Sequence, residues 1–68
     1  MKLKTGMRFE ERAGKEVYLV NSDKELLITG ITEPIATRLY FSEMSEDELE
    51  KDVPGARQAL QGLREWIE

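Results

Sequence analysis

The chain has 68 residues, of which 40% are apolar and 35% are charged, and it contains neither cysteine nor histidine. This composition predicts one globular domain with a thin core, and it excludes disulfides, thiolate zinc sites and the Ser-His-Asp and Cys-His arrangements of nucleophilic catalysis. The net charge of −4 is uneven: residues 1–31 carry six basic and five acidic side chains, whereas residues 32–68 carry four and nine. An acidic surface repels phosphate backbones, so nucleic acid is not an expected partner.

Residues 1–31 predict three strands joined by short turns. Residues 7–11 alternate apolar and polar side chains, which is the period of a half-buried strand. Residues 16–20 are rich in β-branched and aromatic side chains and indicate a second strand, and residues 25–29 indicate a third. Because the turns over 13–15 and 21–24 are short, we expect an antiparallel meander with the second strand in the centre.

Residues 32–53 predict two short helices. Thr32 is a candidate N-cap for the first, because Pro34 then falls in the first turn, where its missing N–H costs nothing. The second begins at a capping box, in which Ser45 accepts from the amide of Glu48 and the Glu48 carboxylate reaches back.

The last predicted helix covers residues 56–67, after Pro54, with Asp52 as a candidate cap. Its apolar side chains are spaced by three and four positions, which is the pattern of one buried α-helical face. They are Val53, Ala56, Leu60, Leu63 and Ile67, with Ala59 and Trp66 widening the stripe.

The predicted fold is therefore a single α+β domain over residues 1–68. A three-stranded antiparallel β-meander in residues 1–31 is followed by two or three α-helices in residues 32–68, packed on one face of the sheet in a winged-helix-like arrangement.

The second and third strands are apolar on both faces. Tyr18 and Val20 point away from Val17 and Leu19, and Leu27 joins the same side. Helices can cover only one face of the sheet, so these three side chains predict an exposed contact surface. In the alternative, strong coiling of the sheet or the segment around Leu3 covers them.

Two charged groups of residues admit a functional interpretation. Arg57, Gln61 and Arg64 lie off the apolar stripe of the last helix, where the arginines either are solvated or receive a carboxylate-bearing segment. Six acids between Glu43 and Asp52 form either a helix start favoured by the dipole or an acidic docking patch. Calcium is excluded there, because this run lacks the central glycine of an EF-hand loop.

The layout of residues 16–20, 25–29, 35–41, 45–53 and 56–67 resembles that of the PqqD-like peptide-recognition domains of ribosomal-peptide biosynthesis. The resemblance covers most of the chain as a pattern of apolar positions. It implies that a leader peptide adds to the edge of the third strand at Glu25, Leu27 and Thr29. The resemblance also implies that Arg57, Gln61 and Arg64 face that peptide.

The sequence thus predicts a non-catalytic module that binds a peptide or protein partner, without metal or cofactor. Two alternatives are an acidic phage-type inhibitor that occupies a basic groove and a winged-helix DNA-binding regulator. No apolar run reaches the ~20 residues that cross a bilayer, so we expect no membrane partner and a cytoplasmic location. The thin core and the spare apolar sheet face also make a homodimer an expectation.

Overall fold

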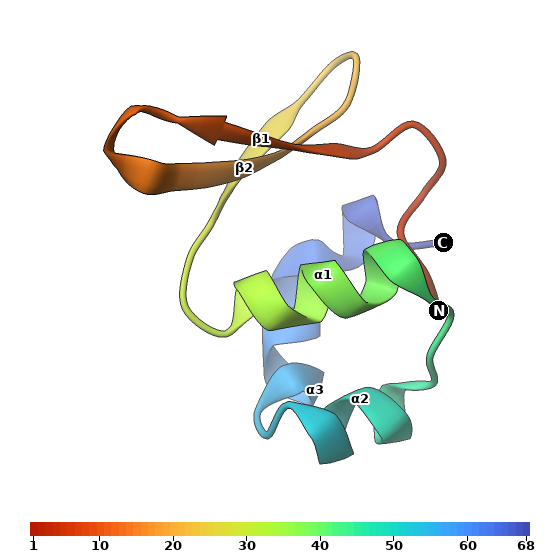
Figure 1. Cartoon of the computed structure of the whole chain (residues 1–68). Helices are drawn as coiled ribbons and strands as arrows, with labels where there is room; N and C mark the ends of the chain where they lie inside the picture. Colours follow the sequence, from red (N-terminus) through yellow and green to blue (C-terminus); the bar gives the residue numbers. More distant parts are fainter.

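The computed structural model, which describes residues 1–68, has a sheet on one side and a layer of helices on the other (Figure 1). Its three antiparallel strands are hydrogen-bonded in the order β1-β2-β3. They are β1 (Arg8–Arg12), β2 (Glu16–Val20) and β3 (Glu25–Ile28). The predicted α+β class and the meander with a central second strand are confirmed. The third strand ends one residue earlier than predicted, at Ile28.

The two turns of the meander are built differently. Between β1 and β2, the 3₁₀ turn η1 (Ala13–Lys15) holds Gly14 at φ 79° and Lys15 at φ 64°. Only Gly14 adopts this left-handed conformation without a steric cost. Between β2 and β3, the side chain of Asn21 accepts from the amides of Asp23 at 2.8 Å and Lys24 at 2.7 Å. Asparagine favours turns because its side chain can bond the backbone two or three residues later in this way.

Four helical segments follow: α1 (Thr32–Phe41), α2 (Glu46–Asp52), α3 (Ala56–Ala59) and the 3₁₀ helix η2 (Leu60–Trp66). The predicted capping box of α2 is confirmed, with Ser45 Oγ accepting from Glu48 N at 3.1 Å and Glu48 Oε1 accepting from Ser45 N at 3.0 Å. Thr32 is not the N-cap of α1, because Ile31 precedes the helix in that position. The Thr32 hydroxyl bonds the backbone of Thr29 instead.

The last helix differs from the continuous α-helix that the spacing predicts. After one α-helical turn the chain tightens into η2, which has three residues per turn. Leu60, Leu63 and Trp66 follow each other at steps of three and are all buried, so the tighter helix places them on one face. Ile67 is only half-buried, outside the helix.

Glu50, rather than Asp52, caps this segment. Its carboxylate accepts from the amide of Gly55 at 2.7 Å and from the amide of Arg57 at 2.9 Å. Gly55 itself stands at φ 95°, a conformation that glycine adopts without strain. A carboxylate of α2 thus accepts hydrogen bonds from the free amides at the start of α3.

The core lies between the inner face of the sheet and the helices. All 13 buried residues are apolar, and no charged or polar residue is buried among them. The fully buried large side chains are Leu19, Ile35, Leu39, Leu49, Leu60 and Leu63.

The N-terminal segment completes this core and does not cover the outer face of the sheet. Leu3 is buried and pairs with Ile67, and its amide donates to Leu39 O at 3.2 Å. The amide of Glu68 donates to Lys2 O at 2.8 Å, so the two ends of the chain lie side by side (Figure 1).

Candidate functional site

The open edge of β3 is the first candidate site, because only β2 pairs with this strand. Asn21 N donates to Lys24 O at 3.0 Å and closes the hairpin. Bonded and non-bonded pairs alternate along an antiparallel ladder, so Leu26 is the next residue to bond β2. Glu25 and Leu27 therefore direct their N–H and C=O groups away from the sheet, where another strand can bind them.

Thr29, the third residue predicted for this edge, is closed to such a partner. Its N–H donates to Thr32 Oγ1, and its C=O accepts from Thr32 N at 3.2 Å and from the Thr32 hydroxyl. The start of α1 thus takes up the backbone of Thr29, and the edge offers two residues.

The outer face of the sheet exposes less apolar surface than the sequence predicts, because Val20 is buried. Val20 is 8% exposed and Tyr18 is half-buried, whereas Leu27 is 40% exposed. The Arg12 guanidinium lies 4.1 Å from the centroid of the Tyr18 ring, which is the geometry of a cation–π contact. Of the three predicted contact residues, Leu27 is the most exposed.

Arg12 also ties the two outer strands together across this face. It donates to Glu25 on β3 and, at 2.9 Å, to Glu10 on its own strand. The hydrogen bond with Glu25 is the main cause that raises the pKa of Arg12, and it lowers the pKa of Glu25. Both groups stay charged at neutral pH, so the face combines a fixed ion pair with one exposed leucine.

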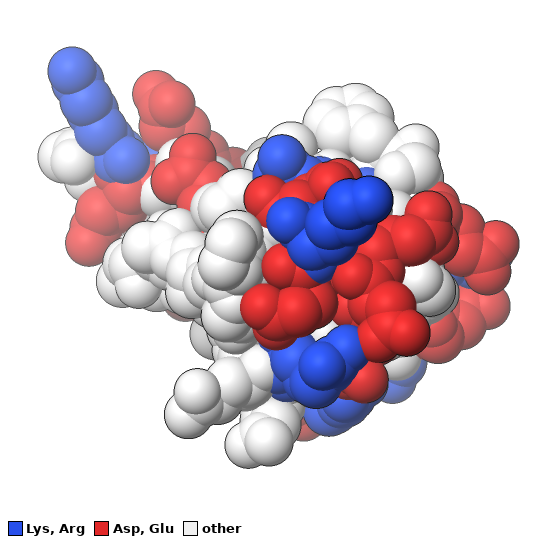
Figure 2. All heavy atoms as spheres, turned by 90° about the horizontal axis from the view of Figure 1, so that it is seen from below, with Lys and Arg blue, Asp and Glu red and all other residues white.

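The two arginines predicted to face the peptide pair with acids of α2. Arg57 donates to Asp47 and lies 3.6 Å from Glu46 Oε2, and Arg64 donates to Glu46 Oε1 at 3.0 Å. Gln61 between them is exposed. Figure 2 shows the result, with red and blue side chains interleaved on the face seen from below. Both arginines therefore form ion pairs with α2 and not with β3.

The acidic run is also largely engaged inside the fold. Backbone hydrogen bonds lower the pKa of Glu48 at the start of α2 and the pKa of Glu50 at the start of α3. Asp52 lies 3.9 Å from Arg38. These contacts correspond to the helix-start interpretation of the run rather than to a free docking patch.

A link between β3 and the last helix comes from residues that the sequence interpretation did not single out. Lys24 Nζ, just before β3, donates to Glu65 Oε2 on η2 at 2.8 Å. This hydrogen bond lowers the pKa of Glu65. Both side chains are exposed. No sequence pattern predicts this pair, because the 3₁₀ geometry of η2 determines which of its residues faces the turn before β3.

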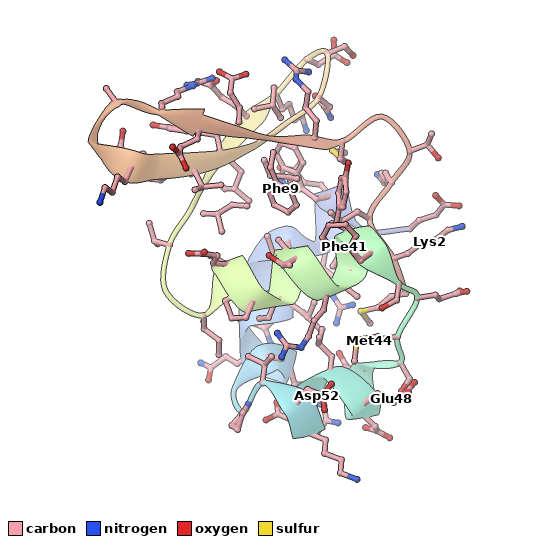
Figure 3. The ribbon with its side chains drawn as sticks, in the orientation of Figure 1. Lys2, Phe9, Phe41, Met44, Glu48 and Asp52 are labelled. Atoms are coloured by element: carbon pink, nitrogen blue, oxygen red, sulfur yellow. The ribbon has the colours of Figure 1, made fainter.

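A further feature that was not predicted is an aromatic patch, formed by the half-buried Phe9 and the exposed Tyr40 and Phe41. The Phe9 and Tyr40 ring centroids are 5.0 Å apart, as are those of Tyr40 and Phe41. Phe41 is 76% exposed at the end of α1, and Phe9 points from β1 towards that helix (Figure 3). The adjacent aromatics were the available signal, because neighbours on a helix cannot both face one core.

The structure has no pocket, no group of three or more acidic side chains placed to hold a metal ion, and no helix long and apolar enough to cross a membrane. No family model, curated protein or solved structure matches the chain. The surfaces described above are therefore interpreted from their own geometry.

Proposed function

We propose that this chain is a non-catalytic binding module that takes up an extended segment of a peptide or protein partner as a fourth strand beside β3. The observation that carries the proposal is the pair of outward-directed backbones at Glu25 and Leu27 on an edge strand. Strand addition uses such backbone groups for affinity and the alternating side chains for specificity.

The side chains beside this edge indicate the chemistry of the partner. Glu25 and Leu27 are two positions apart and share the outer face, so they contact side chains two positions apart on an added strand. An apolar side chain suits the exposed Leu27, and a basic one suits the carboxylate of Glu25, which Arg12 already holds in place. The expected segment is short, because Thr29 closes one end of the edge.

The proposal includes the resemblance to PqqD-like domains, in which the same edge takes a leader peptide. In this chain the two arginines of the last helix are paired with α2, so the peptide contact that the resemblance implies for them requires those pairs to open. We therefore place the main recognition on the β3 edge.

The test begins with a displayed library of random ten-residue peptides selected against the immobilised chain. Selected peptides are then titrated into ¹⁵N-labelled protein. The amide signals of Glu25 and Leu27 should shift most, because their N–H groups become bonded. A selection that yields no binder, or shifts centred on another element, would contradict the proposal.

Matched variants separate backbone pairing from side-chain packing. Leu27→Pro removes an outward N–H and should abolish binding, while folding changes little at an edge position. Leu27→Ala keeps the N–H and should weaken binding only. Glu11→Pro makes the same change on β1 and should leave peptide affinity unaltered. Binding that survives Leu27→Pro would exclude strand addition at this edge.

A further inference from the structure

The second edge of the sheet, formed by β1, is open as well. In β2, Leu19 bonds β3, so the alternate residue Tyr18 directs its backbone groups to Glu10 of β1. Phe9 and Glu11 then direct their N–H and C=O groups outwards. No backbone hydrogen bond outside the ladder involves either residue.

We propose that this edge binds a second copy of the same chain, with the two β1 strands antiparallel and Phe9 opposite its own counterpart across a two-fold axis. The two three-stranded sheets then form one six-stranded sheet. The inference is independent of the peptide site, because it concerns the opposite edge.

The charges of the outer face favour this register. With Phe9 opposite Phe9, Arg8 of each copy lies opposite Glu10 of the other, which gives two attractive cross-strand pairs. Moving the register so that Glu10 faces Glu10 instead places Arg8 opposite Arg12, and every outer pair is repulsive. Placing Glu11 opposite Glu11 pairs Glu10 with Arg12 but opposes two carboxylates on the inner face.

In the single chain, Glu10 accepts from Arg12 through Oε1 and contacts Arg8 through Oε2, so only the longer contact with Arg8 has to change when the dimer forms. Arg8 and Glu10 are 3.5 Å apart within one copy, with 62% and 38% of their side chains exposed. Arg8 can therefore turn to a carboxylate of the second copy without leaving a buried charge. Arg12 stays with Glu25 and Tyr18, which holds the outer face in its present form.

The aromatic patch supplies the apolar part of the same contact. Phe9 projects from β1 towards α1 and touches Tyr40, which touches the exposed Phe41 (Figure 3). When two copies meet at Phe9, the two patches approach each other beneath the joined sheet. Aromatic rings that meet across an interface pack favourably, so Phe41, the most exposed large apolar side chain of the domain, gains a partner in this arrangement.

Sedimentation equilibrium of the 68-residue chain at about 1 mM, a concentration that detects dissociation constants up to the millimolar range, tests the proposal. The expected mass is twice the 7.9 kDa of one chain. Each charge reversal, Arg8→Glu or Glu10→Arg, turns two attractive pairs into repulsive ones and should raise the dissociation constant about 10- to 100-fold.

The decisive sample mixes the two reversed variants in equal amounts. Glu at position 8 of one then faces Arg at position 10 of the other, so a heterodimer should form although each variant alone does not dimerise. Lys51→Glu and Glu43→Arg carry the same charge changes on exposed positions of the helical half and should dimerise like the unaltered chain. Far-UV circular dichroism checks that all four variants are folded.

A monomeric chain at that concentration overturns the proposal, and so does dimerisation that both reversals leave unchanged. Rescue that fails in the mixture of folded variants overturns the register. If a reversal prevents folding, hydrogen exchange of the unaltered chain decides. The amides of Phe9 and Glu11 should exchange more slowly as the concentration rises, and exchange independent of concentration refutes the contact.

Discussion

The two edges of the sheet each direct the backbone groups of two residues outwards, but their surroundings differ. At β3 the start of α1 takes the backbone of Thr29, and the pair Lys24–Glu65 fixes the other end, so two outward residues remain. At β1 no neighbouring element takes up the edge, and the charges of the strand match those of an inverted copy. The hydrogen bonds of the flanking residues thus determine how many backbone groups each edge strand leaves unpaired.

The largest expected effect comes from removing the support that both edges share. Leu60 is fully buried at the start of η2, so Leu60→Ala should lower the free energy of unfolding by about 3 kcal/mol. Peptide binding and dimerisation should weaken together, because both need the folded sheet. Urea denaturation measures the change, with the exposed Gln61→Ala as a control expected within about 0.5 kcal/mol of the original. If only one edge lost its activity, the edges would not share this core.

A smaller change should alter the β3 edge alone. Thr32→Val removes the hydroxyl that bonds both backbone groups of Thr29 and should cost about 1 kcal/mol. The amide of Thr29 should then exchange faster with solvent, and selected peptides should extend their contact to it. Hydrogen exchange followed by NMR measures both effects. Dimer stability should remain the same, and a change there would show that the edges are coupled.

Relieving the backbone strain at Lys15, in the turn between β1 and β2, should stabilise the fold on the β1 side of the sheet. Lys15 has a left-handed φ of 64°, a conformation that costs any residue with a side chain about 1–2 kcal/mol. Glycine avoids this cost, but it loses more conformational entropy on folding, which offsets part of the gain in stability. Lys15→Gly should therefore raise stability by about 0.5 kcal/mol. Thermal unfolding measures it, with Lys51→Gly on exposed α2 expected to destabilise. A lower melting temperature for Lys15→Gly would show that the lysine makes a contact worth more than the strain.

Acid should give the smallest effect, and part of that effect should come from two ion pairs on the β3 side. The folded chain lowers the pKa of Glu25 through its bond with Arg12 and the pKa of Glu65 through its bond with Lys24. A carboxylate whose pKa is lower in the folded chain stabilises the fold at pH values above its unfolded pKa of about 4.3. This stabilisation is lost as the pH falls through the pKa of the folded chain. Melting temperatures between pH 6 and pH 3 should decline less in Glu25→Gln. Equal declines in both proteins would contradict this assignment.

Local signals in the sequence were sufficient for much of the fold. The strands, the Asn21 turn and the Ser45 capping box depend on neighbouring residues, and the structure has each of them where the pattern predicts it or within one residue. The pattern of steps of three and four could not separate an α-helix from the tighter η2. That choice depends on how Leu63 and Trp66 pack in the shared core, which is a property of the folded molecule.

The candidate surfaces were less predictable, because long side chains choose partners only after folding. Arg57 and Arg64 were expected to face the third strand and instead pair with acids of α2 that precede them in the sequence by ten or more positions. Arg12 covers the Tyr18 ring that the strand pattern left exposed. The resemblance to PqqD-like domains placed the edge at Glu25, Leu27 and Thr29, and the register of the sheet directs the backbones of the first two outwards. The start of α1 takes up the backbone of Thr29.

The pairing of Leu3 with Ile67 has a kinetic consequence. This contact joins the first and last turns of the chain, so the loop that it closes is nearly as long as the polypeptide. Closing a long loop costs more entropy than forming a local hairpin or helix. The amides of Lys4 and Glu68, which donate to Trp66 O and Lys2 O across this contact, should therefore gain protection last during refolding. A circular permutant that joins the ends with a short linker and opens the chain at the Asn21 turn would make this contact local and should fold faster.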